Sequence, residues 1–105
     1  MKVMVMHKLK KGKTMEQYRK YSREFDQPDI AKSHVIKKFE VYEIDGTESG
    51  GKPPYDILEI MTVDDWESFV EEEYSEGHKS ERQMWLDEWV EEGSIITMYG
   101  DEITI

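Results

Sequence analysis

Two strand-like segments that follow one another directly constrain the fold of this chain most strongly. Both are rich in β-branched and aromatic side chains, and the loop between them contains Gly50-Gly51 and Pro53-Pro54, as expected for a hairpin with a long connection. One helical pattern precedes this hairpin and another follows it. One more strand pattern lies before the first helical pattern, and another lies after the second. Strands are therefore expected at residues 2–9, 34–44, 55–63 and 95–99.

The first helical segment has a clear start signal. Thr14, followed three residues later by Gln17, has the spacing of a capping box. Because a proline disfavours helix at the residue before it, we expect this helix to run to about Asp26 and to end before Pro28.

The second helical segment is expected in two pieces. Asp64 or Asp65 is a suitable N-cap for the first piece, and residues 74–77 interrupt the helical pattern. Ser80 opens the second piece, and Gly93 is a natural stop after it.

The order of elements is therefore β-α-β-β-α-β, which predicts one α+β domain of the ferredoxin-like type over residues 1–105. This topology gives an antiparallel sheet with strand order 4-1-3-2 and with the helices on one face. Phe39, Val41, Leu58 and Ile60 are expected to face the helices. The uncovered face is expected to carry Ile36, Tyr42, Ile44, Tyr55, Ile57, Met61 and Val63.

That uncovered face is too apolar to remain in water. A two-fold homodimer in which two such faces meet around a shared cavity would cover it, and this arrangement is a dimeric α+β barrel.

Two glutamates in the hairpin, Glu40 and Glu59, are the first candidates for chemistry. A symmetric loop would place Glu40 opposite Glu59 and Tyr42 opposite Ile57, with these side chains facing the cavity. Opposed carboxylates repel each other and lose hydration in a cavity, which raises a carboxyl pKa towards the range that acid–base catalysis needs. Such a pair also suits a cationic or hydrogen-bond-donating ligand. A slip of one residue in the pairing would instead turn the glutamates outward.

His7 is the third catalytic candidate, because histidine is the usual proton shuttle near neutral pH. It faces either the helices or the cavity, and the apolar Met4 and Met6 leave the alternation undecided. Asp26 either caps a helix or reaches the cavity mouth. The residues expected to contact a ligand are Tyr42, Tyr55, Ile57, Met61, Lys38 and Asp26.

The composition excludes several kinds of site. The chain has no cysteine, which rules out disulfides, thiolate nucleophiles and Cys-based metal centres. His7, His34 and His78 lack the spacing of a metal site, and no glycine-rich nucleotide motif or G-x-S-x-G is present. We therefore expect no metal and no cofactor.

Charge excludes two classes of partner. Fourteen basic and 24 acidic residues give a net charge of −10, which repels nucleic acid and anionic lipid surfaces. No segment has the pattern of a signal peptide or of a membrane span, so we expect a soluble, cytoplasmic protein.

Several motifs resemble one protein family. They are Asp26-Gln27-Pro28, Val35 followed by Phe39-Glu40-Val41-Tyr42, and Gly50-Gly51-x-Pro53-Pro54-Tyr55-Asp56-x-x-Glu59. Together they resemble the REDY-like (HapK) proteins of the dimeric α+β barrel superfamily. The resemblance implies a homodimer with an internal cavity and a link to the biosynthesis of tripyrrole pigments and other secondary metabolites, and it does not fix a reaction.

Three functions are compatible with these observations. The first is a cavity protein that binds a hydrophobic aromatic or pyrrole-like small molecule, with acid–base chemistry by the cavity carboxylates. The second is a cofactor-independent monooxygenase or cyclase. The third is a non-catalytic protein whose acidic surface docks on a basic partner.

Overall fold

The computed structural model describes residues 1–105, and its sheet has the predicted topology. The elements in chain order are β1 (Lys2–His7), α1 (Met15–Tyr21), the π-helical turn η1 (Ser22–Asp26), α2 (Gln27–Ile30), β2 (Ile36–Glu43), β3 (Ile57–Val63), α3 (Trp66–Glu73), α4 (Glu76–Trp89) and β4 (Ile96–Gly100). The sheet has the order β2-β3-β1-β4, which is the predicted order read in the other direction, and its neighbouring strands are antiparallel. The prediction is confirmed.

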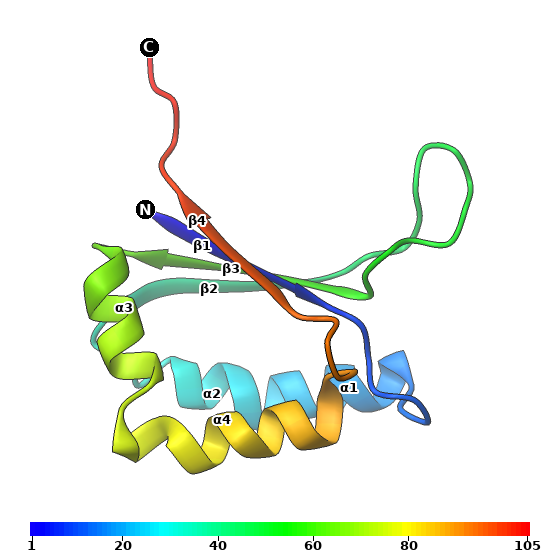
Figure 1. The fold of residues 1–105 in the computed structure, drawn as a ribbon, viewed down its shortest axis with the longest axis horizontal. Helices are drawn as coiled ribbons and strands as arrows, with labels where there is room; N and C mark the ends of the chain where they lie inside the picture. The colour runs from blue at the N-terminus through cyan, green and yellow to red at the C-terminus, as the bar shows by residue number, and fades with distance from the viewer.

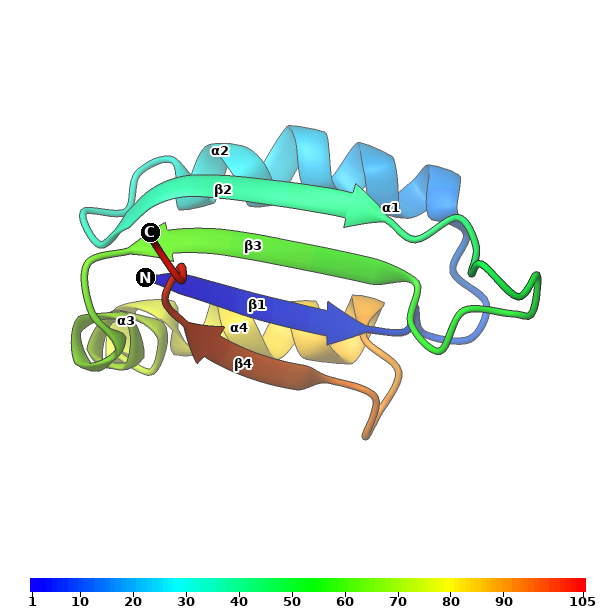
Figure 2. The same cartoon turned by 90° about the horizontal axis from the view of Figure 1, so that it is seen from above.

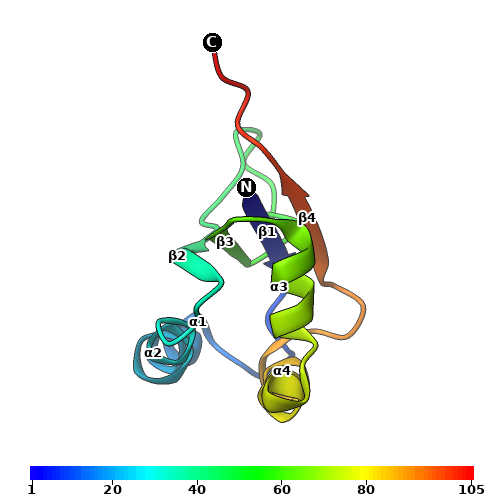
Figure 3. The ribbon, with the colours of Figure 1, turned by 90° about the vertical axis from the view of Figure 1, so that its left-hand side faces the viewer.

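All helices lie on one face of the sheet (Figure 1). The run α1-η1-α2 lies along the β2 side, whereas α3 and α4 lie along the β1 and β4 side (Figure 2). Seen end-on, α1 and α2 lie beside α3 and α4 on the same face of the sheet (Figure 3).

The first helical run starts as predicted but continues further. Thr14 and Gln17 form the capping box. The expected end before Pro28 is wrong, because the run continues through Pro28 to Ile30. In the π-helical turn η1 the N–H of Gln27 bonds to the carbonyl of Ser22, five residues back. After this wider turn α2 begins at Gln27, so Pro28 lies in the first turn of α2. The N–H groups of a first turn have no partner within the helix, so the N–H that proline lacks is not needed there.

The second helix is broken as predicted. Asp65 caps α3 by accepting a hydrogen bond of 2.7 Å from the N–H of Ser68. The break is shorter than expected, since α4 already begins at Glu76. None of the helices has the length and apolar character needed to span a bilayer.

The predicted register of the hairpin is wrong. The expected pairing holds only between Ile36 and Val63, after which a bulge adds one residue to β2 before Lys38. From there Glu40 pairs with Ile60, and Val41 pairs with Glu59. One extra residue is enough to place Glu40 and Glu59 on opposite faces of the sheet.

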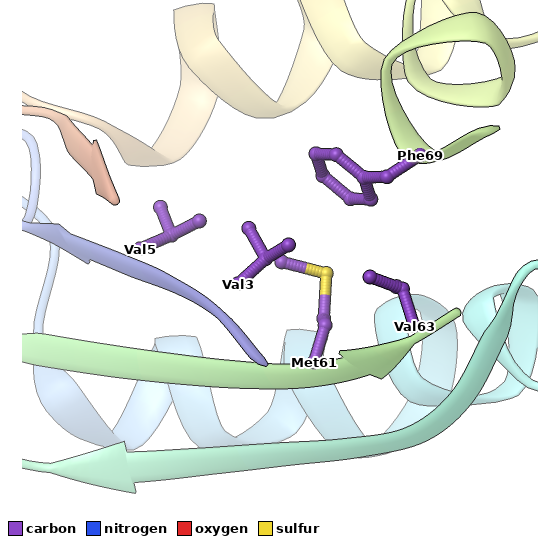
Figure 4. Close-up of a cluster of buried hydrophobic side chains, with 5 residues drawn as sticks. All are labelled: Val3, Val5, Met61, Val63 and Phe69. Atoms are coloured by element: carbon purple, nitrogen blue, oxygen red, sulfur yellow. The ribbon is translucent and has the colours of Figure 1, made fainter. Parts of the chain in front are cut away.

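The faces of β3 are also the reverse of the prediction. Its buried residues are Ile57, Glu59, Met61 and Val63, which face the helices, whereas Leu58 and Ile60 alternate with them on the outward face. Val3, Val5, Met61, Val63 and Phe69 pack together between the sheet and α3 as the core (Figure 4). Because β3 is apolar on both sides, its alternation alone does not identify the buried face.

The outward face of the sheet is accordingly built from different residues than expected. Strand pairing places Met4, Met6, Leu58, Ile60, Ile96 and Met98 there, together with Tyr42. Ile96, Met98 and Tyr42 are exposed in the single chain.

Candidate functional site

A cavity of about 520 Å³ lies between the sheet and the helices. All four strands contribute to its lining, and so do α1, η1, α2, α3 and α4. Six aromatic side chains line it, namely Tyr21, Phe25, Trp66, Phe69, Tyr74 and Trp85. The predicted cavity was to lie between the uncovered faces of two protomers, whereas this one lies on the helical side of the sheet within one chain.

Glu59 is the most deeply buried carboxylate of the cavity, with an exposed fraction of 5%. The hydroxyl of Tyr18 donates a hydrogen bond of 3.2 Å to its Oε1. Nε2 of His7 lies 3.8 Å from the same oxygen. The second oxygen, Oε2, has no hydrogen-bond partner within the protein, so it is available to a ligand.

His7 faces the helices and is completely buried, which answers the question that its position in the sequence left open. Its Nδ1 lies 3.1 Å from the carbonyl of Lys8. Since a carbonyl only accepts, Nδ1 carries a proton. Nε2 lies 3.4 Å from the hydroxyl of Tyr18, which itself accepts a hydrogen bond of 3.4 Å from Nε1 of Trp85.

His7 and Tyr18 are not part of the cavity lining, so they contact Glu59 from outside the cavity. Glu59, Tyr18 and His7 come from β3, α1 and β1, three elements far apart in the sequence. Burial raises the pKa of the Tyr18 hydroxyl, as does the nearby charge of Glu59, so that Tyr18 remains a proton donor. The arrangement holds a carboxylate in place and keeps one of its oxygens directed to the ligand space.

Asp26 also lines the cavity. Its side chain makes no capping hydrogen bond, so it lines the cavity and does not cap a helix. Burial, together with the negative charges of Glu59 and Asp29, raises the pKa of Asp26 to about 8. Burial likewise raises the pKa of Glu73 on the opposite wall, against the lowering effect of Arg82. Near neutral pH Asp26 therefore keeps its proton in most molecules.

Two aromatic side chains of the cavity lining are exposed to solvent. Phe25 and Tyr74 line the cavity and are 64% and 61% exposed. Arg82 lies with its guanidinium 4.6 Å from the centre of the Tyr74 ring and donates a hydrogen bond of 3.2 Å to the Tyr74 hydroxyl. Its Nε lies 3.3 Å from Oε1 of Glu73, so the one arginine of the lining forms an ion pair, although Nε itself makes no hydrogen bond.

The other predicted site residues are not gathered at this cavity, with the exception of Met61, which is buried and lines it. Glu40, Tyr42 and Lys38 lie on the outward face. Tyr42 donates a hydrogen bond to Glu40, which lowers the pKa of that carboxyl, and Lys38 lies 3.8 Å from Glu40.

Two of the predicted aromatic and apolar contacts also lie elsewhere. Ile57 is buried beside Glu59 but does not line the cavity. Tyr55 precedes β3 and borders a small surface depression with Lys8 and Pro54. The symmetric register had assigned these residues to the site. Because that register is wrong, they lie outside the site.

Sequence reasoning missed the supporting residues, above all Tyr18 and Trp85. Both are amphipathic side chains on the inner face of a helix. A buried O–H or N–H at such a position needs a hydrogen-bond partner, and this need is the signal that could have identified them. The structure contains no group of three or more His, Asp or Glu side chains arranged to hold a metal ion.

A four-stranded antiparallel sheet in this order, with all helices on one face, defines an α+β protein of the ferredoxin-like fold. The family model of the REDY-like protein HapK matches residues 1–102, and the chain belongs to this family. No curated protein matches the chain in sequence.

Solved structures agree with the fold. HapK from Hahella chejuensis has a TM-score of 0.69 at 12% identity, with 100% of this chain and 99% of that chain covered. The Arabidopsis thaliana protein At3g17210 has a TM-score of 0.76 at 12% identity, with 99% and 96% covered. A dimeric ferredoxin-like protein of unknown function from Bacteroides fragilis has a TM-score of 0.62 at 18% identity, with 92% and 90% covered. At these identities the likeness concerns the fold.

Proposed function

We propose that this protein binds a small aromatic or pyrrole-like molecule in the cavity between the sheet and the helices, with Glu59 as the hydrogen-bond acceptor for a ligand N–H. The observation that carries the proposal is the free Oε2 of Glu59 in a cavity lined by aromatic side chains. The volume of about 520 Å³ lies within the range of small-molecule sites.

Oε2 of Glu59 accepts no hydrogen bond from the protein, so a ligand donor can reach it without breaking an existing contact. Hydrogen bonds to an ionised acceptor are stronger than those between neutral groups. A pyrrole N–H supplies such a donor on a flat apolar ring. The ring would contact Trp66, Phe69 and Trp85 while its N–H satisfies Glu59.

Membership of the REDY-like family supports a place in secondary-metabolite biosynthesis, where tripyrrole pigments and their precursors have this chemistry. The protein would hold such an intermediate away from water.

A homodimer is part of the proposal. The Bacteroides fragilis protein of the same fold is described as dimeric. The outward face of this sheet is apolar at Met6, Leu58, Ile60, Ile96 and Met98, which suits a second copy of the chain.

Titration calorimetry with 2,2′-bipyrrole and 2,2′-bithiophene tests the binding function, since the two probes share their shape and only the first has N–H donors. The wild type should bind bipyrrole about tenfold more tightly, which corresponds to about 1.4 kcal/mol. Glu59→Gln should reduce this preference at least threefold. Glu71→Gln removes the same charge at an exposed position outside the cavity and should leave it unchanged. An equal preference in all three proteins would contradict the proposal.

The contact between Glu59, Tyr18 and His7 favours a second candidate, acid–base catalysis in a cofactor-independent cyclase or monooxygenase. In this reading Glu59 removes a proton from an acidic C–H of the ligand. Deuterium exchange at the central carbon of a phenyl β-diketone, followed by NMR, should be accelerated by the wild type and not by Glu59→Gln. Oxygen consumption with phenolic substrates separates the monooxygenase from the cyclase.

A further inference from the structure

We propose that the ligand of this cavity is an aromatic cation, a molecule whose flat ring carries a positively charged nitrogen, and that Glu59 and Asp26 are its two anchoring carboxylates. The inference rests on the proposed function, because it specifies the charge of the molecule that the same cavity holds.

The charge balance of the lining is the first support. Six carboxyl side chains line the cavity, namely Asp26, Asp29, Glu59, Glu72, Glu73 and Glu81, against Arg82 and His78 as the only basic side chains. Arg82 is engaged by Glu73 and Tyr74. An anionic ligand would meet uncompensated negative charge, whereas a cation would be attracted by it.

The carboxyl oxygens of the two anchors that have no protein partner are the second support. Glu59 is buried, and its Oε2 accepts no hydrogen bond from the protein. Asp26 has no hydrogen bond and no ion pair through its side chain, although lysine and arginine are plentiful on the surface. Tyr18 and His7 contact only Oε1 of Glu59, so its Oε2 and the carboxyl group of Asp26 are both left for the counter-charge of a ligand.

The aromatic lining is the third support, because ring faces attract cations as well as apolar surfaces. Trp66 and Phe69 are stacked with their centres 5.5 Å apart, and Trp85 lies on the far wall on α4. A charged nitrogen over a tryptophan ring gains about 0.5–2 kcal/mol, more as the site loses water. A strongly solvated small cation such as a metal ion would gain nothing from these rings.

Binding should be coupled to the release of a proton. The other titratable and charged groups of the cavity lining come from five elements, namely Tyr21 on α1, Asp29 on α2, Glu59 on β3, Glu72 and Glu73 on α3, and His78, Glu81 and Arg82 on α4. With a pKa of about 8, Asp26 holds its proton in the empty cavity at pH 7. A bound cation stabilises the ionised form and expels that proton, so affinity should rise with pH up to about 8 and then level off.

The test uses three probes of nearly the same shape: 1-methylquinolinium, which is a permanent cation, neutral 1-methylnaphthalene, and anionic 1-naphthoate. Calorimetry at pH 7 in two buffers of different ionisation enthalpy measures both affinity and proton release. We expect the cation to bind at least tenfold more tightly than the neutral probe, naphthoate to bind least, and up to one proton to be released on binding of the cation. Asp26→Asn should abolish the proton release and reduce the preference, whereas Glu71→Gln should change neither.

The outcomes separate this inference from the proposed function. If the neutral and cationic probes bind equally well, the cation inference is wrong while the aromatic cavity stands. If no probe binds, both are wrong. If the preference for the cation persists unchanged in Asp26→Asn and in Glu59→Gln, the attraction is that of the whole acidic chain and the two anchors are wrongly assigned.

Discussion

The hydroxyl of Tyr18 lies between the carboxylate of Glu59 and the indole of Trp85, donating to the first at 3.2 Å and accepting from the second at 3.4 Å. One oxygen atom thereby links α1, β3 and α4, which are the elements on either side of the cavity. Tyr18 is almost completely buried, so water cannot replace it in either contact.

Tyr18→Phe should therefore destabilise the protein. The change leaves the buried Glu59 Oε1 and the Trp85 N–H without their partner, and the free energy of unfolding in urea should fall by about 1–3 kcal/mol. Tyr21→Phe is a matched control, since Tyr21 is half-buried on the same helix and its hydroxyl makes no hydrogen bond. Equal losses in the two variants would show that the contacts of the Tyr18 hydroxyl contribute nothing.

The raised pKa of Asp26 predicts a pH-dependent stability. The folded chain binds this proton more tightly than the unfolded chain, whose aspartate titrates near 3.8. Folded molecules therefore carry more protons between about pH 4 and pH 8, and the stability that Asp26 contributes is lost as pH rises through this window. Asp26→Asn does not titrate.

Urea unfolding of both proteins at pH 4.5, 6.5 and 8.5 measures this difference. The variant should be more stable than the wild type at pH 8.5, and the gap should close towards pH 4.5. Glu73 titrates in both proteins and largely cancels in the comparison. A gap that is independent of pH would contradict the assignment of the raised pKa to Asp26.

The outward face of the sheet predicts the assembly. Ile60→Lys places a charge at the centre of the apolar outward face, so it should convert the dimer to a protomer of 12.5 kDa in analytical ultracentrifugation. Ala31→Lys adds the same side chain at an exposed position among the helices and should leave the dimer intact. Should the unmodified protein sediment as a monomer at micromolar concentration, the dimer proposal fails.

Local signals in the sequence were sufficient for most of the fold. The Thr14 capping box, the interrupted second helix and the alternation of strands with helices are each set by neighbouring residues, and the split βαβ rule turns their order into the sheet topology. The helix end at Pro28 was missed because a π-helical turn repositions the proline, and nothing in the local pattern predicts that turn.

The candidate site depended on non-local information. A single bulge residue after Ile36 decides the face of Glu40, and the apolar character of both sides of β3 hides the face of Glu59. The sequence draws attention to Glu59 as a carboxylate in a strand, and the structure buries it in β3. Its partner Tyr18 lies 41 positions away in the sequence, so their contact emerges only when α1 packs under the sheet.

A crystal structure of the protein with bound 2,2′-bipyrrole tests the central claim most directly. We expect the ligand between the sheet and the helices, with an N–H within hydrogen-bond distance of Glu59 and its rings against Trp66 and Trp85. A ligand bound at Glu40 and Tyr42, between the outward faces of two protomers, would contradict it.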